Sequence, residues 1–428
     1  MGIFIRVLIL KKICKALILI RTHLDLIVAA MVLFILFSPQ GWWDGFYGSH
    51  RFDHYVFAAV TLLLIIVCIA DAAEKKRAFP AWLRENIWLA LYSAALVLSV
   101  VFSTDPRLSL SLLTRCLSGL FVVYIINSGE FTYGKIRRIF GIVTVGVLIT
   151  AVYAIIQRIQ GVAPNKSFTD LTVHTSMPGR VYSFFDNPVV YAFALAPLLL
   201  VAAAYALGGK TRSRAAVGAI SFALGCAALL MTYSRGAWLG FAAGAFLVTV
   251  LCKPKLTPVL LILGALALIP ESIRERALSV FNQIDQSVRY RSLLSSAGLD
   301  VIKSRPVFGA GLGLDTVKNY VLENSFWHPI KPEYVFPHTH NLPVQVWCEM
   351  GIFGFTTFFG AVFHNIIRAM RSLRGKDMAT RVFVSSLIAG VAAMLVFGIA
   401  DYPFSYSRIM MLFWILFGLL ASVRKIDS

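Results

Sequence analysis

Long apolar segments separated by short polar ones run along most of this chain. Twelve segments are apolar enough, over roughly the length of a membrane-crossing helix, to be candidate spans. They cover residues 22–38, 54–71, 87–103, 108–127, 137–158, 189–207, 214–232, 236–252, 256–270, 343–367, 381–400 and 407–423. The pattern predicts an all-α polytopic membrane protein with about 12 transmembrane helices.

The first segment is the least regular, because Arg21, His23 and Asp25 interrupt it. Residues 3–20 alternate basic and apolar positions without a small-residue cleavage site after them. They fit a basic helix on the membrane surface or a bent extension of the first span. The boundaries of helix 1 therefore stay open, and no cleaved signal peptide is expected.

The apolar pattern stops between the ninth and tenth candidate spans, where residues 271–342 are polar. This segment is far longer than a usual connection. Apolar spacing inside it predicts helices over 271–278, 287–302 and 314–322, with a glycine turn at 309–313 between the last two. We expect three parts: nine helices in 1–270, a partly helical loop in 271–342, and three helices with a short tail in 343–428.

Composition agrees with a membrane location. The chain is 58% hydrophobic and 14% charged, and its formal net charge is +19. If both termini are cytoplasmic, every inner loop carries a cluster of Lys and Arg, as the positive-inside rule requires. The charge is then explained by topology and membrane lipids rather than by nucleic acid. This orientation predicts a bacterial inner-membrane protein whose 271–342 loop is periplasmic.

Three of the predicted outer segments carry arginine close to the membrane surface. Arg180 lies in residues 159–188, and Arg235 lies in the tight turn 231–236. The long loop carries four arginines that could bind an anion: Arg274, Arg276, Arg289 and Arg291. A guanidinium offers paired hydrogen bonds to phosphate oxygens. Several converging arginines therefore predict a pyrophosphate site that needs no metal ion, and the sequence has no acidic pair typical of a magnesium site.

The long loop ends in Pro337-His338-Thr339-His340-Asn341, just before the tenth span. A neutral imidazole can take a proton from a sugar hydroxyl at neutral pH, which makes His338 a candidate general base. The two histidines also fit a metal site, but no cysteine or acidic residue stands at ligand spacing nearby. An interfacial histidine with a structural role is the third interpretation.

Several short motifs in this order resemble the O-antigen ligase/polymerase superfamily, and most closely the O-antigen ligases of lipopolysaccharide biosynthesis. The motifs are Ser234-Arg235-Gly236-Ala237, Arg291 followed by 302–306, Gly309-Ala310-Gly311-Leu312-Gly313, His338-Thr339-His340-Asn341 and Glu349-Met350-Gly351-Ile352-Phe353-Gly354. Tyr182 to Pro188 is also similar. The motifs cover roughly residues 180–360, and the number of spans extends the resemblance to the whole chain.

The resemblance implies an inverting, metal-independent glycosyltransferase without a cofactor. Such enzymes transfer a glycan from undecaprenyl pyrophosphate to a sugar hydroxyl of lipid A-core on the periplasmic face. His338 would be the general base. Arg235 and Arg291, and more weakly Arg180, would bind the donor pyrophosphate, with Arg289 replacing Arg291 if the motifs align two residues earlier. His340 and Asn341 would orient His338, bind the acceptor or serve the structure.

Other functions remain open at this point. An O-linked protein oligosaccharyltransferase and an O-antigen polymerase belong to the same superfamily. The former tends to carry an extra C-terminal periplasmic portion, whereas this sequence ends shortly after its last span. A lipid or sugar transporter is the alternative from another class. Transporters usually place ionisable residues near mid-membrane, where this chain offers mainly Arg115.

Overall fold

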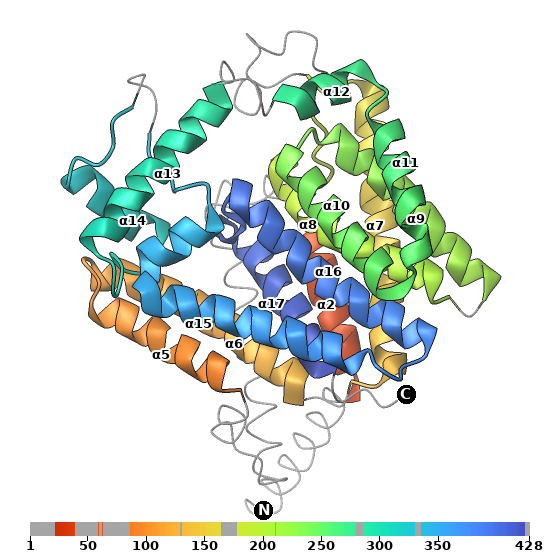
Figure 1. The fold of residues 1–428 in the computed structure, drawn as a ribbon, viewed down its shortest axis with the longest axis horizontal. Coiled ribbons are helices and arrows are strands. Elements are labelled where there is room, and N and C mark those ends of the chain that lie inside the picture. The colour runs from red at the N-terminus through yellow and green to blue at the C-terminus, as the bar shows by residue number, and fades with distance from the viewer. Residues whose placement is uncertain are drawn as a thin grey trace, which may run out of the picture.

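The computed structural model describes residues 22–38, 59, 62, 86–128, 131–163, 178–209, 211–279, 286–329 and 335–423. Their regular structure is helical throughout, which confirms the all-α fold class. The α-helices, arranged as in Figure 1, are α2 (Leu24–Phe37), α5 (Ile87–Val101), α6 (Pro106–Ser128), α7 (Tyr133–Gln160), α8 (Pro188–Leu207), α9 (Arg212–Met231), α10 (Arg235–Cys252), α11 (Thr257–Ala267), α12 (Glu271–Leu278), α13 (Gln286–Ser304), α14 (Leu314–Glu323), α15 (Leu342–Ser372), α16 (Met378–Ala400) and α17 (Ser407–Ser422).

Seven helices in the described part of the chain are long and apolar enough to cross a membrane: α6, α7, α8, α9, α10, α15 and α16. Helices α2, α5 and α17 are apolar but shorter, and each lies in a predicted span. Apart from residues 59 and 62, the predicted span 54–71 lies outside the described residues. The number of twelve spans therefore stays a prediction, as does the membrane orientation.

Helix α11 occupies the predicted ninth span, but it is short and none of its side chains is buried. It meets α12 at a bend of 103°, so the pair forms either a broken span or a re-entrant segment. The bend turns the polar helix α12 over the ends of the neighbouring helices at the top of Figure 1. The chain thus begins to cover the bundle immediately after α11.

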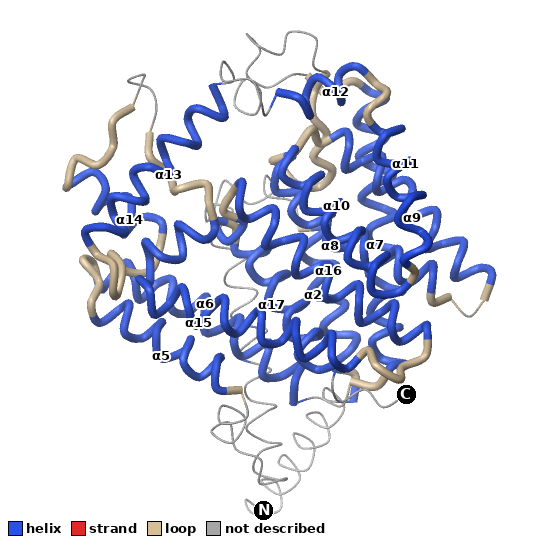
Figure 2. The backbone as a smooth tube through the Cα atoms, viewed as in Figure 1, coloured by secondary structure: helices blue, strands red, loops and turns tan. Residues whose placement is uncertain are grey.

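The long loop contains the three helices that its apolar spacing predicts: α12, α13 and α14. Helices α13 and α14 share a small buried core made of Leu294, Ala297, Val301, Ala310, Val317, Val321, Phe336 and Cys348. Because Cys348 belongs to α15, the loop completes its core on a bundle helix. Figure 2 shows how irregular segments join these helices to the bundle.

Helix α15 is interrupted at Gly351, whose φ of +62° is open to glycine but strained for other residues. The segment from Pro306 to the glycine turn takes up backbone groups at this interruption. Ala310 N–H donates to the Cys348 carbonyl at 2.7 Å, and Ile352 N–H donates to the Pro306 carbonyl at 2.9 Å. The interruption is therefore satisfied inside the protein, as a break near membrane depth must be, and it fixes the glycine turn against α15.

Candidate functional site

The turn between α9 and α10 brings Arg180 to the helix ends. The segment 178–182 lies along this turn, with Val181 N–H donating to the Met231 carbonyl at 3.2 Å. The buried Arg180 side chain donates through Nε to the Thr232 carbonyl at 2.6 Å. A connection of a few residues can hold a buried guanidinium here because its own carbonyl accepts the hydrogen bond.

Helix α12 and the residue that follows it contact the same turn. Arg276, also buried, donates from Nε to the Tyr233 carbonyl at 3.4 Å. Arg235, at the first position of α10, donates from Nη1 to the Ser279 hydroxyl at 2.6 Å. Three arginines from three segments therefore gather around one short turn.

The positive charges of this group act on one another. Burial, followed by the charges of Arg276, Arg291 and Arg235, lowers the pKa of Arg180 to about 9, while the charge of Asp401 acts in the opposite direction. The structure thus brings together Arg180, Arg235 and Arg291, which were predicted to bind pyrophosphate, and selects Arg276 from the other arginines of the long loop. An anion bound among these guanidiniums would relieve their repulsion.

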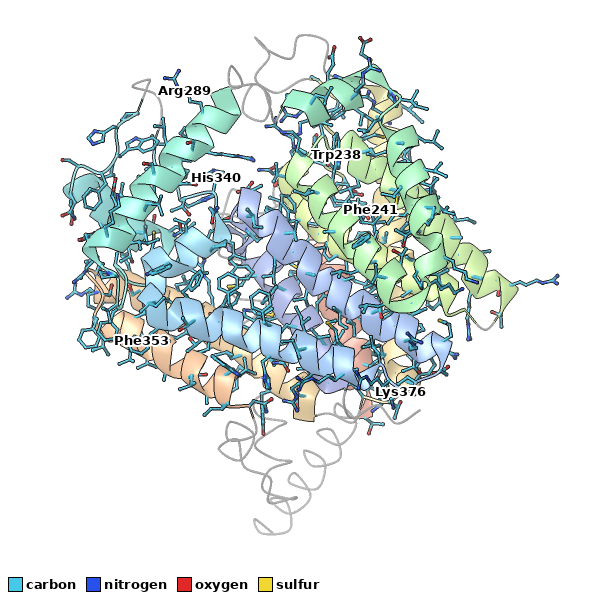
Figure 3. The ribbon with its side chains drawn as sticks, in the orientation of Figure 1. Trp238, Phe241, Arg289, His340, Phe353 and Lys376 are labelled. Carbon is cyan, nitrogen blue, oxygen red and sulfur yellow. The ribbon has the colours of Figure 1, made fainter. Side chains whose placement is uncertain are left out.

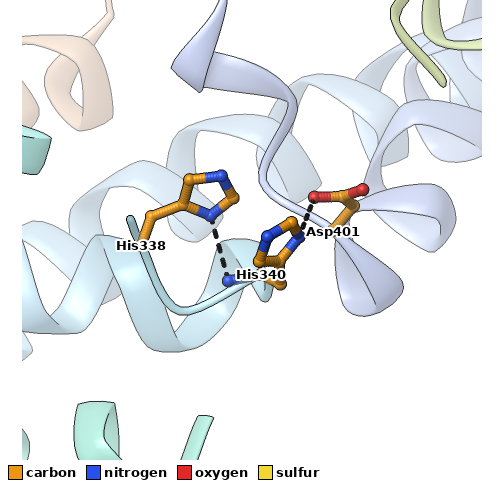
Figure 4. A group of neighbouring side chains, drawn as sticks. All are labelled: His338, His340 and Asp401. Carbon is orange, nitrogen blue, oxygen red and sulfur yellow. Dashed lines mark hydrogen bonds and ion pairs between the residues drawn. The ribbon is translucent and has the colours of Figure 1, made fainter. Parts of the chain in front are cut away.

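The two histidines lie beside this group, where the loop meets α15 and the end of α16. His340 Nδ1 is 2.7 Å from Asp401 Oδ1, and His340 adopts the left-handed conformation with φ +48°. The His340 backbone N–H donates to His338 Nδ1 at 3.1 Å (Figure 4). The backbone N–H of Tyr402 also holds Asp401 Oδ1, at 2.8 Å.

These contacts fix different roles for the two imidazoles. An ionised Asp401 can only accept, so a neutral His340 donates from Nδ1 and keeps its lone pair on Nε2. His338 Nδ1 accepts a backbone N–H, so a neutral His338 carries its proton on Nε2 and presents a donor there. His340 therefore has the tautomer that a general base requires.

Electrostatics supports this assignment. Burial, together with the charges of His340 and Arg291, lowers the pKa of His338 to about 3, although the charge of Asp401 acts to raise it. Burial raises the pKa of Asp401, but His340 and Arg291 outweigh it and hold that pKa well below its usual range. Asp401 is thus a carboxylate, whereas His338 is a neutral ring that holds a proton poorly.

Arg291 joins the arginine group to the histidine–aspartate pair. Its Nη2 is 3.5 Å from Asp401 Oδ2. Arg289, two positions earlier on α13, is exposed, and Figure 3 shows it on the side of the helix away from His340. The geometry favours Arg291 over Arg289 for the site.

Both polar atoms of the Asn341 side-chain amide form hydrogen bonds with backbone groups. Its Oδ1 accepts from Val344 N–H at 3.0 Å and caps α15, and its Nδ2 donates to the Ile399 carbonyl at 3.0 Å. These bonds hold the start of α15 against the end of α16. They favour the structural role among the alternatives that the sequence left open for Asn341.

His338, His340 and Asp401 also form a group whose candidate metal-ligand atoms all lie within 4.8 Å of one another. The sequence did not reveal this third ligand, because Asp401 is 61 positions from His340. Arg291 beside Asp401 and the neighbouring arginines repel a cation. The arrangement therefore fits an anion better than a metal ion.

The lowered pKa of His338 predicts a pH-dependent stability. Unfolded histidine binds a proton near pH 6.5, so the unfolded chain takes up more protons than the folded one between about pH 6.5 and 3. The contribution of His338 to the free energy of unfolding is fully present above pH 6.5. It is lost as pH falls, and about 2 kcal/mol of it is gone at about pH 5. We expect the apparent Tm of detergent-solubilised protein to fall across this range, and to fall less in His338→Asn. If Tm falls equally with pH in the unchanged protein and in His338→Asn, a buried neutral His338 is contradicted.

The fold and the site define a class: a multi-pass helical membrane protein with an arginine-rich, histidine–aspartate site where several helices end. Residues 220–359, or 140 of the 428 residues, match the model of the family described as O-Antigen ligase, and this match supports the O-antigen ligase superfamily for the chain. The matched segment includes Arg235, Arg276, Arg291 and His340, whereas Arg180 and Asp401 lie outside it. A search of the curated proteins finds no match.

Proposed function

We propose that this protein is an O-antigen ligase, transferring a glycan from undecaprenyl pyrophosphate to a sugar hydroxyl of lipid A-core. The observation that carries the proposal is the contact between Arg291 and Asp401. Through it an arginine group suited to pyrophosphate adjoins a histidine suited to activate a hydroxyl. A glycosyl transfer from a pyrophosphate donor requires both in one place.

In the proposed reaction the acceptor hydroxyl loses its proton to a histidine while its oxygen bonds to the anomeric carbon of the donor glycan. The bond from that carbon to the pyrophosphate oxygen breaks, and its electron pair leaves with the pyrophosphate. Arg180, Arg235, Arg276 and Arg291 stabilise the growing negative charge. Attack opposite the leaving group inverts the anomeric configuration.

We assign the base to His340, with Asp401 orienting it and stabilising the imidazolium that forms. The sequence predicted His338 for this role, and that assignment stays the alternative. His338 is disfavoured by its lowered pKa and by the hydrogen bond that occupies its Nδ1. Its Nε2–H is suited instead to donating to a donor phosphate or a sugar hydroxyl.

The proposal includes independence from metal ions, since the arginines supply the positive charge that a metal would bring. Transfer by the purified protein should persist in EDTA. Loss of transfer in EDTA, restored by one divalent cation, would instead assign the group His338, His340 and Asp401 to metal binding.

The deciding experiment is reconstitution of the full chain in vesicles with an undecaprenyl-pyrophosphate glycan and one acceptor at a time. Lipopolysaccharide core, a pilin-like protein and a second molecule of donor separate ligase, protein transferase and polymerase. We expect sugar to appear on the lipopolysaccharide core. Movement of intact donor across the membrane without transfer to any acceptor would favour the transporter alternative.

A further inference from the structure

Helix α15 carries a buried carboxyl, Glu349, whose side-chain hydrogen bonds within the described residues go to neighbours of the site, Gln345 and Tyr402. Glu349 is 3% exposed. Its Oε1 accepts a hydrogen bond from Gln345 Nε2 at 2.9 Å and another from the Tyr402 hydroxyl at 3.2 Å. Because a buried polar group without a hydrogen-bond partner is costly, each of these groups holds the others in place.

One of these bonds leads to the histidines. Gln345, which is fully buried, accepts from the backbone N–H of Thr339 through its Oε1 at 3.0 Å. Thr339 lies between His338 and His340 in the chain, so this bond fixes the position of the histidine loop relative to α15. Glu349 holds the Gln345 amide in the orientation that presents Oε1 to the loop.

The other bond leads to the aspartate. Tyr402 follows Asp401, and its backbone N–H donates to Asp401 Oδ1 while its hydroxyl donates to Glu349. Glu349 and Tyr402 line a small cavity whose other walls are mostly apolar, among them Leu312, Phe358 and Trp414. A donor released from Glu349 would therefore find few alternative partners, and the links to the two loops share one acceptor oxygen.

We infer that Glu349 is a positioning residue that holds the His340 loop and the Asp401 loop at the separation their hydrogen bond requires. The inference deepens the proposed function, because His340 and Asp401 are its base and orienting carboxylate. It concerns the geometry of the pair, so it can be tested without the reaction.

Three variants of the full chain in nanodiscs test this positioning. Glu349→Leu removes the acceptor at similar volume, Glu349→Gln keeps one carbonyl oxygen for both donors, and Tyr402→Phe removes only the hydroxyl. Thr357→Val is the matched control, because Thr357 is buried on the same helix and bonds only within it. The first measurement is hydrogen exchange of peptides covering 335–341 and 400–406.

We expect Glu349→Leu to speed exchange in both peptides, Tyr402→Phe in the second alone, and Glu349→Gln and Thr357→Val in neither. Unchanged exchange in Glu349→Leu and Tyr402→Phe would overturn the inference, and so would equal changes in Thr357→Val. If Glu349→Leu does not fold, Tyr402→Phe decides alone.

The second measurement is transfer. A loosened pair should lower kcat about 10- to 100-fold in Glu349→Leu with an unchanged donor KM, since misplacement by about 1 Å costs roughly that much. Glu349→Gln should restore most of the rate. A low rate in both Glu349→Leu and Glu349→Gln would mean that the charge of Glu349 is needed, and it would overturn the positioning role. Loop exchange that changes as expected, in a protein with no transfer to any acceptor, would leave the inference standing and remove the proposed function.

Discussion

Replacing His340 by asparagine is expected to lower transfer about 100- to 10,000-fold, the range that a general base contributes. Asparagine can adopt the left-handed backbone of His340 (φ +48°), and its amide N–H can still donate to Asp401. The variant therefore keeps the loop and a donor to Asp401, but it removes the imidazole and with it the basic lone pair at Nε2. The measurement is kcat with lipid-linked donor and lipopolysaccharide core, with donor KM expected to change little.

His338→Asn is the matched comparison. Its amide oxygen can accept the His340 backbone N–H that now donates to His338 Nδ1, so the loop keeps its shape while the imidazole is lost. We expect this variant to retain a measurable fraction of the rate, well above that of His340→Asn. The reverse order, with His338→Asn inactive and His340→Asn active, would return the base to His338 as the sequence predicted.

The same experiment extends to Asp401. Asparagine at 401 can still accept from His340, but it removes the charge that stabilises an imidazolium and can reorient to favour the other tautomer. We expect the Asp401→Asn rate to approach that of His340→Asn. The double variant should lose little more than either single one, because the two side chains act as a unit.

Much of this architecture could be predicted because it depends on local patterns. Apolar length places the described helices in or near eleven predicted spans, and apolar spacing predicts α12, α13 and α14 inside the long loop. The glycine turn is also visible as a motif: Gly309, Gly311 and Gly313 all adopt positive φ, where other residues are strained.

The site depends on information that no local pattern contains. Arg289 and Arg291 are both on α13, but two positions correspond to about 200° around a helix, so only one of them can face the histidines. The sequence does not say how α13 is rotated on its small core. Arg276 was one of four loop arginines that could bind an anion, but the sequence does not show that the bend before α12 carries it to the turn between α9 and α10.

Asp401 was missed because it belongs to no motif and lies far from the histidines in sequence. One signal was available: Asp401 is an acidic residue at the end of an apolar span, a position where a charge usually has a function or a partner. The choice between His338 and His340 as the base could not be made from the sequence either. It depends on a carboxylate and a backbone N–H whose positions follow from the packing of α15 against α16.

The second large effect is expected at Arg291. Arg291→Lys keeps the positive charge beside Asp401 but loses the paired hydrogen bonds that a guanidinium gives to phosphate oxygens. A charge-assisted hydrogen bond is worth about 1.5–3 kcal/mol, so the donor KM should rise about 10- to 100-fold. The measurement is transfer as a function of donor concentration in vesicles of constant lipid composition.

Arg289→Lys is the control, because it makes the same chemical change two positions away on an exposed part of α13. Its donor KM should stay within about twofold of the unchanged protein, as for most exposed substitutions.

Inorganic pyrophosphate should compete with the donor, and more weakly in Arg291→Lys than in Arg289→Lys. If the two lysine variants behave alike, the arginine group does not hold the pyrophosphate through Arg291. Pyrophosphate that inhibits without competing would place its binding elsewhere, and the contact between Arg291 and Asp401 would then serve only to orient the histidine–aspartate pair.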